Sequence, residues 1–391
     1  MKNFTYYTPT KVFFGENQEN NLGEILKSYN VKKVLFHYGQ TSIKKSGLYD
    51  VVINQLNAAQ IDYVELGGVE PNPKLSLVHK GVELCKKENV DLVLAVGGGS
   101  VIDSAKSIAH GALVDFDPWK FSIKEETPRK ALPVGVILTI AAAGSEMSDS
   151  CVITNEETLE KRGFNTITNR PLFAIMNPKY TFTVSKYQTA CGIVDILMHT
   201  LERFFADPEE KSQLSDSIAI SLMKTVIENG KIVMADPTNY NARAELMWAS
   251  SISHNSLTGI GKSFQMSVHQ IEHEVSGMFD EVAHGAGLAV VWPAWAKVAY
   301  KHDLKHFKRF AYEVMEVEQT DSSENDIIAS IDKIKEFFKE IGMPVTLKEL
   351  NIEESNIEQL AYNFTFKGKR TVKDIFEVDY EKALEILTIA K

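Results

Sequence analysis

The chain has 391 residues and a formal net charge of −10, and 44% of its residues are hydrophobic. The acidic balance disfavours nucleic-acid binding by phosphate neutralisation, and the apolar stretches are too short to span a membrane. Three cysteines without a CxxC pair fit a reducing cytoplasm better than a disulfide framework. We therefore expect a cytoplasmic enzyme with more than one domain.

The first half of the sequence alternates short apolar runs with amphipathic segments. Strands are expected at 33–38, 61–66, 92–96 and 132–140, and helices at 42–59, 75–87 and 101–113. This alternation predicts an α/β domain with a doubly wound, Rossmann-like parallel sheet. Residues 161–185, rich in Pro, Asn and Thr, are expected to connect it to the second half.

The second half is dominated by segments with helical periodicity and predicts an all-α domain. Helices are expected at 185–205, 212–229, 241–256, 264–278, 285–301, 304–317, 324–341 and 375–390. The expected domains are a nucleotide-binding α/β domain at 1–184 and a helical metal-binding domain at 185–391.

A triple-glycine turn, Gly97-Gly98-Gly99-Ser100, lies between an expected strand and an expected helix. Glycines without Cβ atoms let an anion approach backbone N–H groups, and the helix dipole favours negative charge there. The turn is thus a candidate phosphate seat. The alternative is structural: Ser100 and Asp103 would form an ordinary helix cap, and glycines tighten any turn from a strand into a helix.

A second turn, Gly39-Gln40-Thr41-Ser42, follows the first expected strand. Two such turns at the carboxyl ends of parallel strands could hold an extended cofactor. Neither turn matches the GxGxxG fingerprint or the GxxxxGK[ST] phosphate loop.

Two pairs of possible metal-binding residues have the i,i+4 spacing that places both side chains on one helix face. They are Asp195 with His199, and His269 with His273. His284 follows at an expected helix start. One carboxylate with two or three imidazoles can bind a divalent metal. Each residue also has an ordinary structural interpretation, but a carboxylate among apolar neighbours, as at Asp195, needs a partner. We interpret His254 as structural.

The same residues contain a rival motif. His269-Gln-Ile-Glu-His273 matches HxxEH, the inverted zinc-peptidase pattern, with Glu272 as the would-be base. That interpretation leaves the glycine turns unexplained.

Taken in order, these motifs resemble the iron-containing (group III) alcohol dehydrogenases, and most of all their butanol dehydrogenase branch. The resemblance also rests on Thr10-Lys-Val-Phe-Phe-Gly15, Gly144-Ser-Glu146 and Ala283-His-Gly-Ala-Gly287. It implies that Fe²⁺, or Zn²⁺, is bound by Asp195, His199, His269 and His284. It also implies that His273 lies beside the nicotinamide and assists proton transfer.

The expected cofactor contacts are Gly39, Gln40, Thr41, Asn72, Gly97, Gly98, Gly99, Ser100, Asp103, Thr139 and Lys161. Ala143 stands where many relatives carry Thr, which puts that contact in doubt. The turn after the first strand lacks the carboxylate of NAD-restricted members, so NADP(H) is favoured over NAD(H).

The resemblance implies NAD(P)H-linked interconversion of small aldehydes and alcohols, such as butanal and butanol. It also implies a homodimer, because relatives commonly pair through the N-terminal strand. Two other classes stay open. One is a metal-dependent lyase or cyclase of the dehydroquinate-synthase type, and the other is a catalytically idle cofactor-binding protein.

Overall fold

The computed structural model describes residues 1–209 and 211–391. The chain divides into two compact units. The α/β unit comprises Tyr7–Val184 and Pro237–Ser251, and the helical unit comprises Met1–Tyr6, Ser185–Asp236 and Ile252–Lys391. One junction lies at the expected boundary after residue 184, whereas residues 1–6 and 237–251 each belong to the other unit.

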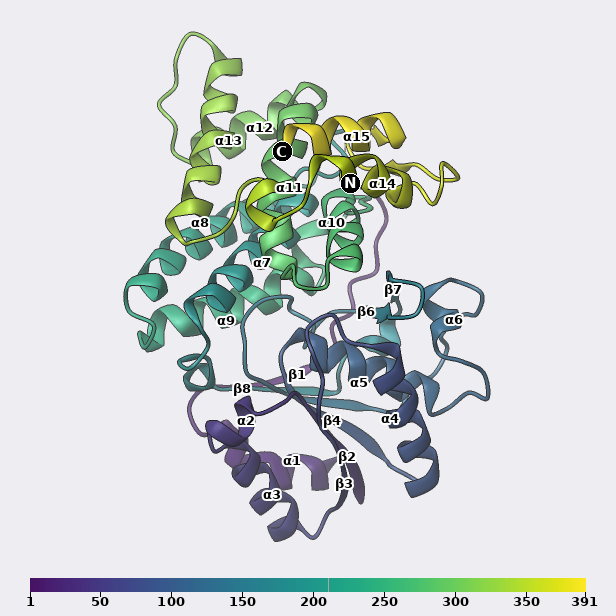
Figure 1. Ribbon diagram of the computed structural model, residues 1–391. Helices are drawn as coiled ribbons and strands as arrows, with labels where there is room; N and C mark the ends of the chain where they lie inside the picture. Colours follow the sequence, from purple (N-terminus) through teal and green to yellow (C-terminus); the bar gives the residue numbers. More distant parts are fainter. Residues whose placement is uncertain (210) are drawn as a thin grey trace. The chain divides into compact units, whose positions relative to one another are not determined.

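Six strands form a parallel sheet in the α/β unit (Figure 1). In spatial order they are β1 (Lys11–Phe14), β8 (Phe173–Met176), β5 (Val134–Leu138), β4 (Leu92–Gly97), β2 (Lys33–Tyr38) and β3 (Asp62–Leu66). Neighbouring strands all run parallel. The chain order reverses between β2 and β4, and ligands of open parallel sheets bind beside such a reversal, at the carboxyl ends of the strands. The turns after β2 and β4 therefore form the expected binding edge.

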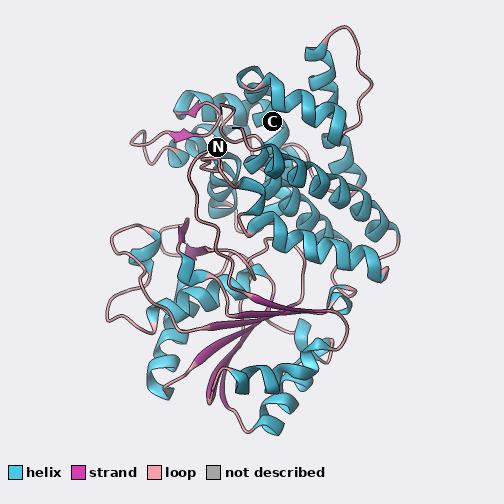
Figure 2. Ribbon diagram, turned by 180° about the vertical axis from the view of Figure 1, so that it is seen from behind, coloured by secondary structure: helices cyan, strands magenta, loops and turns pink. Residues whose placement is uncertain are grey.

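Helices cover both faces of this sheet (Figure 2). They are α1 (Leu22–Ser28), α2 (Ser42–Lys45), α3 (Leu48–Ala59), α4 (Leu75–Glu88), α5 (Gly99–Gly111) and α6 (Trp119–Ser122). Along β2, Leu35 packs into the core with α4 and α5, while the next residue, Phe36, packs into the core with α1 and α3. Successive side chains of a strand point to opposite faces, so a strand covered on both faces is apolar throughout. The expected α/β fold class is confirmed.

The structure differs from the sequence expectation at several positions of the α/β unit. The helix expected at 42–59 is interrupted at Gly47, whose φ of 77° allows the chain to turn between α2 and α3. The segment 161–185 is more than a connection, because it contains β8 and most of β7 (Glu160–Asn165), which pairs antiparallel with β6 (Ser150–Asn155). Strand β1 was not expected. Strands β1 and β8 have four residues each, too short for a clear period-2 pattern.

The helical unit contains most of the remaining helices. They are α7 (Lys186–Phe204), α8 (Gln213–Ala235), α10 (Ser267–Met278), α11 (His284–Ala299), α12 (Leu304–Arg309), α13 (Ser323–Glu340), α14 (Ile357–Phe364) and α15 (Tyr380–Ile389). Helix α9 (Tyr240–His254) lies mainly in the α/β unit. A short antiparallel pair, β9 (Val372–Lys373) with β10 (Glu377–Val378), makes this half mostly rather than wholly helical. No described helix is long and apolar enough to cross a membrane.

Candidate functional site

The four expected metal ligands all lie on helices of the helical unit. Asp195 and His199 are one turn apart on α7, His269 lies in the first turn of α10, and His284 is the first residue of α11. Almost the whole length of α7 is buried, so its polar residues face protein rather than water. The i,i+4 spacing places both ligands of α7 on one side of the helix, as the sequence predicts.

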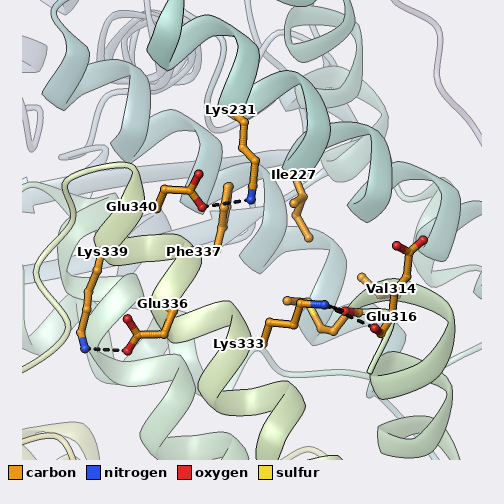
Figure 3. A pocket seen from close by; sticks show the side chains of 10 residues that line it. Ile227, Lys231, Val314, Glu316, Lys333, Glu336, Phe337, Lys339 and Glu340 are labelled. Carbon is orange, nitrogen blue, oxygen red and sulfur yellow. Dashed lines mark hydrogen bonds and ion pairs between the residues drawn. The ribbon is translucent and has the colours of Figure 1, made fainter. Parts of the chain in front are cut away.

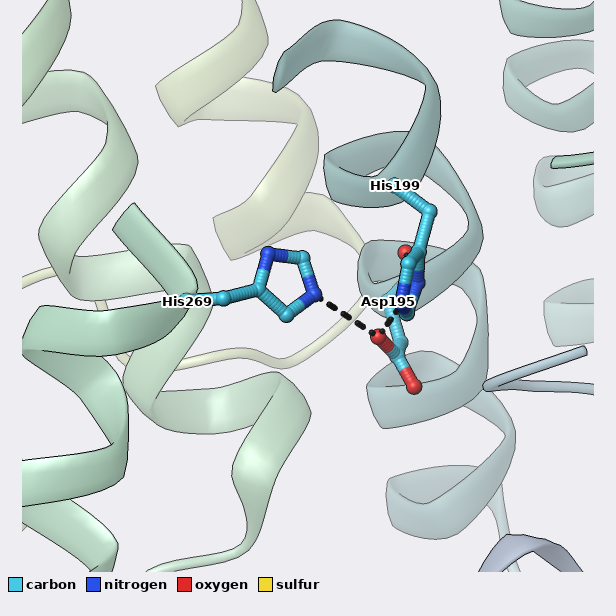
Figure 4. A group of neighbouring side chains, drawn as sticks. All are labelled: Asp195, His199 and His269. Atoms are coloured by element: carbon cyan, nitrogen blue, oxygen red, sulfur yellow. Dashed lines mark hydrogen bonds and ion pairs between the residues drawn. The ribbon is translucent and has the colours of Figure 1, made fainter. Parts of the chain in front are cut away.

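These four side chains converge on one carboxylate oxygen. Oδ1 of Asp195 lies 3.0 Å from Nδ1 of His199, 3.6 Å from Nε2 of His269 and 3.8 Å from Nε2 of His284. Ligand atoms of Asp195, His199 and His269 lie within 4.8 Å of one another (Figure 4). The group spans 90 residues of sequence from first to last, so only the tertiary fold brings it together.

Burial and unmet hydrogen bonding make this group fit a cation. Asp195, His199 and His269 are each at most 6% exposed. Oδ1 of Asp195 and Nε2 of His269 have no hydrogen-bond partner among the described residues. Buried polar atoms rarely go unsatisfied unless they bind water or an ion. A carboxylate with imidazoles is a donor set that suits both Fe²⁺ and Zn²⁺.

Two further carboxylates hold the imidazoles in place. Glu202 pairs with Nδ1 of His269 and also accepts the backbone N–H of Val268 at 2.8 Å, at the start of α10. Glu272 pairs with Nδ1 of His284. A carboxylate on Nδ1 fixes the proton there and leaves Nε2 free to bind a metal. Glu202 is not among the residues expected from the sequence, and only its i,i+3 spacing from His199 could have indicated it.

The position of Glu272 also bears on the rival peptidase motif. Its side chain is fully buried and pairs with Nδ1 of His284. The HxxEH spacing therefore has a different structural explanation, in which the glutamate orients an imidazole from the next helix.

The pKa values of the group follow from burial and from these carboxylates. Burial lowers the pKa of His199 to about 4, although Asp195 opposes the change. Burial also disfavours a charged His269, but Glu202 and Asp195 outweigh it and raise its pKa to about 9. Burial would raise the pKa of Asp195, yet the neighbouring imidazoles hold it well below its usual range.

Two other histidines lie beside this group. The half-buried His273 has its ring centre 5.5 Å from that of His284. His254, which we interpreted as structural from its sequence, packs against the expected ligand His199: the ring centres lie 3.9 Å apart and the planes are tilted by 33°.

The glycine turn of the α/β unit forms the start of α5. Gly98 is the N-cap residue, and no side chain of its own can cap the helix. A Cβ atom on Gly98 would lie 2.3 Å from Cγ2 of Ile140, so this position needs glycine. The alternative cap by Ser100 and Asp103 is wrong. The carboxylate of Asp103 instead accepts the hydroxyl of Ser145 at 2.5 Å and the amide of Val152 at 2.9 Å, which ties α5 to β6.

The other expected cofactor positions in this unit lie around the binding edge. The amide of Thr139 donates to the carbonyl of Gly97 at 3.1 Å. The buried Nζ of Lys161 donates to Oδ1 of Asn72 at 3.1 Å, although 89 residues separate them. The structure brings these two together because the amide of Thr154, on the hairpin that carries Lys161, donates to the carbonyl of Pro73.

The turn after β2 is more exposed. Gly39 accepts the amide of Gly68 at 2.8 Å, and Gln40 and Thr41 are exposed. Beyond them, Nζ of Lys44 lies over the rings of Tyr38 and Tyr49, 5.6 and 5.0 Å from their centres.

A separate cavity of about 730 Å³ lies in the helical unit between α8 and α13 (Figure 3). Its charges are paired within the protein: Lys231 with Glu340 at 3.0 Å, and Lys339 with Glu336 at 2.7 Å. Lys333 donates to backbone carbonyls. This cavity contains none of the expected site residues.

Comparisons with known proteins identify the family. Residues 9–178 match the family model described as "Iron-containing alcohol dehydrogenase", and residues 189–390 match "Fe-containing alcohol dehydrogenase family, C-terminal". The chain belongs to the iron-containing alcohol dehydrogenase family. The predicted resemblance is therefore confirmed, and the match over both halves does not favour the lyase or peptidase alternatives.

Several members of this family are similar over their whole length. The NADH-dependent butanol dehydrogenase A of Clostridium acetobutylicum is 40% identical over 99% of both chains. The NADPH-dependent aldehyde reductase YqhD of Escherichia coli is 32% identical over the full length of both. The crystal structure of the NADH-dependent butanol dehydrogenase A from Thermotoga maritima superposes with a TM-score of 0.96 at 39% identity, covering 100% of this chain and 99% of that one.

Proposed function

We propose that this iron-containing alcohol dehydrogenase interconverts short- to medium-chain primary alcohols and aldehydes, such as butanol and butanal, with a nicotinamide cofactor. The observation that carries the proposal is the convergence of three imidazoles on one buried carboxylate oxygen of Asp195. The names of the similar butanol dehydrogenase and aldehyde reductase support the substrate class.

Asp195, His199, His269 and His284 would hold the cation, with Fe²⁺ as the proposed metal and Zn²⁺ as the alternative. Such a cation supplies Lewis-acid polarisation of a carbonyl oxygen. Glu202 and Glu272 would keep His269 and His284 in the tautomer that binds metal.

The overall reaction converts aldehyde, NAD(P)H and a proton to alcohol and NAD(P)⁺. The nicotinamide supplies the hydride that forms the new C–H bond. The oxygen gains a proton, which His273 or a water molecule would donate. His273 suits this task because it is half buried and its ring neighbours that of the ligand His284.

The α/β unit would hold the cofactor. Gly97 to Ser100 would place backbone N–H groups at the pyrophosphate, at the start of α5. Asn72, Thr139 and Lys161 lie around the same sheet edge and would contact the cofactor, while Asp103 would fix α5 to the neighbouring hairpin.

We further propose a preference for NADP(H). No carboxylate lies in the turn from Gly39 to Ser42, and the short helix α2 that begins at Ser42 ends with Lys44 and Lys45. Acids in this turn would bind ribose hydroxyls and repel a 2′-phosphate. Similar proteins are named for NADH or for NADPH, so the preference of this chain needs a direct test.

Steady-state kinetics of wild type and Gln40→Asp with NADH and NADPH test this preference. Wild type should have the higher kcat/KM with NADPH, and the variant should lose part of that advantage. Higher wild-type kcat/KM with NADH, or unchanged NADPH kinetics in Gln40→Asp, would contradict the preference without touching the dehydrogenase assignment.

The main test of the proposed function is an aldehyde panel, including butanal, assayed with each nicotinamide before and after chelation. We expect butanal-dependent oxidation of the cofactor that chelation abolishes and Fe²⁺ or Zn²⁺ restores. Turnover that survives complete metal removal would refute the metal-dependent mechanism.

We also propose a cytoplasmic homodimer. Strand β1 lies at one edge of the parallel sheet, and sheet edges can pair with a second chain. Light scattering coupled to gel filtration would report twice the chain mass, and a single chain mass would refute the dimer.

A further inference from the structure

The side chain that covers a face of the ligand His199 belongs to His254, the last residue of α9. The two ring centres are 3.9 Å apart and the planes are tilted by 33°, so the ring of His254 packs closely against that of His199 without being parallel to it. By comparison, the ring of His269 lies 4.4 Å from that of His199 at a steeper 53°. The closest aromatic contact recorded for His199 therefore comes from a residue outside the expected ligand set.

A contact against the face of the ring is compatible with metal binding. An imidazole donates its lone pair in the plane of the ring, so a neighbour on its face does not compete for the cation. His254 is also absent from the described groups whose ligand atoms converge. Its contact with His199 is thus a contact between rings and not a shared ligand position.

The His199 ring is otherwise held along one edge. Its Nδ1 lies 3.0 Å from the carbonyl oxygen of Asp195, one turn earlier on α7, and 3.0 Å from Oδ1 of the same residue. A bond at one nitrogen still permits the ring to rock about it, and a ring packed on one face opposes that motion. His269 and His284 each pair through Nδ1 with a glutamate outside the expected ligand set, whereas the side chain paired with Nδ1 of His199 among the described residues is Asp195, which is itself an expected ligand.

The backbone that carries His254 is fixed locally. Directly after it, Oδ1 of Asn255 accepts the amide of Leu257 at 3.0 Å, and Ser256 adopts a left-handed conformation with φ of 79°. The hydroxyl of Thr258 reaches back to the carbonyl of Ser253 at 3.4 Å. This tight turn ends α9 and sets where the His254 ring lies.

We propose that His254 is a positioning residue, whose stacked ring holds His199 in the orientation that binds the metal. This inference rests on the proposed function, since it presumes that His199 is a ligand. It predicts that a flat ring at position 254 matters, whereas a nitrogen atom there does not.

Cobalt(II) binding to purified metal-free protein tests the proposal, because the affinity and the visible absorption of the bound ion report ligand geometry without any turnover. His254→Ala should weaken Co²⁺ binding about 10–100-fold, the usual effect of losing a group that orients a ligand. Its visible spectrum at saturation should also change. His254→Phe, which keeps a flat ring, should restore both the affinity and the spectrum.

The matched control is His302→Ala. His302 also belongs to the helical unit and stacks face to face on an aromatic ring, Phe376, at 5.0 Å and 15°. Its removal should leave Co²⁺ binding unchanged, and thermal melting of every metal-free variant shows whether it is folded.

Three results would overturn or redirect the account. Wild-type affinity and spectrum in a folded His254→Ala protein would refute the positioning role. Failure of His254→Phe to restore binding, when that variant melts like wild type, would also refute it, because the nitrogen would then be needed. Failure of the wild type itself to bind Co²⁺ would instead refute the proposed metal site.

Discussion

Gly285 offers the sharpest test of how this fold sets the position of His284, one of the proposed metal ligands. It follows His284 in the first turn of α11, where that helix packs against α7. A Cβ atom on Gly285 would lie 2.2 Å from the carbonyl oxygen of Cys191 and 2.6 Å from its Cα, both backbone atoms of α7. Ordinary contacts begin at 3.4 Å, so Gly285→Ala needs the start of α11 to move by about 1.2 Å.

Such a shift is large for a metal site. His284 is adjacent to the substitution, and its Nε2 lies 3.8 Å from Oδ1 of Asp195. Productive ligand geometry tolerates about 0.5 Å. We therefore expect Gly285→Ala to weaken metal binding about 10–100-fold and to lower the free energy of unfolding by about 1–3 kcal/mol.

Competition with a coloured chelator measures the zinc affinity, and urea unfolding of the metal-free protein measures stability. The control is Gly230→Ala in α8, where the new Cβ would lie 3.3 Å from Cγ2 and 3.4 Å from Cδ1 of Ile193, both side-chain atoms rather than backbone. That variant should keep its zinc affinity. Because alanine replaces glycine in the middle of a helix, its free energy of unfolding can rise by up to about 1 kcal/mol. Wild-type zinc affinity in Gly285→Ala would refute the reasoning.

Two further predictions concern other buried groups. Glu202→Gln should weaken zinc binding about 10–100-fold, because the amide no longer supports His269 as a ligand, and an unchanged affinity by chelator competition would contradict this. His37 is fully buried between the carbonyl of Leu66 and the hydroxyl of Ser104, each at 2.8 Å, and burial lowers its pKa from 6.5 to about 4. The unfolded chain takes up a proton on this histidine near pH 6.5, and the folded chain only near pH 4. The contribution of neutral His37 to the free energy of unfolding is therefore complete above pH 6.5 and falls by about 3 kcal/mol as the pH drops to 4. His37→Asn should lack this contribution. Urea unfolding should therefore show that the difference in free energy of unfolding between wild type and variant narrows from pH 7.5 to 4.5. A constant difference would refute the lowered pKa of His37.

The features that were predicted from sequence are those encoded over one or two turns of chain. The spacing of Asp195 and His199 places both on one side of α7, and three consecutive glycines mark the turn from β4 into α5. Local periodicity is enough to recognise such features. The apolar run of β4 likewise predicts a strand covered on both faces.

The features that were missed depend on contacts between distant segments. Glu202 reaches His269 across 67 residues, and Lys161 reaches Asn72 across 89. Strand β8 is recognisable mainly because β1 and β5 pair with it. His254 was read as structural because nothing near it in sequence indicates that its ring stacks on His199. Such pairings are set by the tertiary fold and leave no periodic trace in sequence.

The most direct test of the central claim is the metal content of wild type and Asp195→Asn, measured by elemental analysis and paired with butanal-dependent oxidation of NADPH. Asparagine keeps the size of the side chain but removes the charge on which three imidazoles converge. We predict about one Fe²⁺ or Zn²⁺ per wild-type chain, and a folded variant with neither metal nor turnover. A variant that keeps both at wild-type levels would contradict the account.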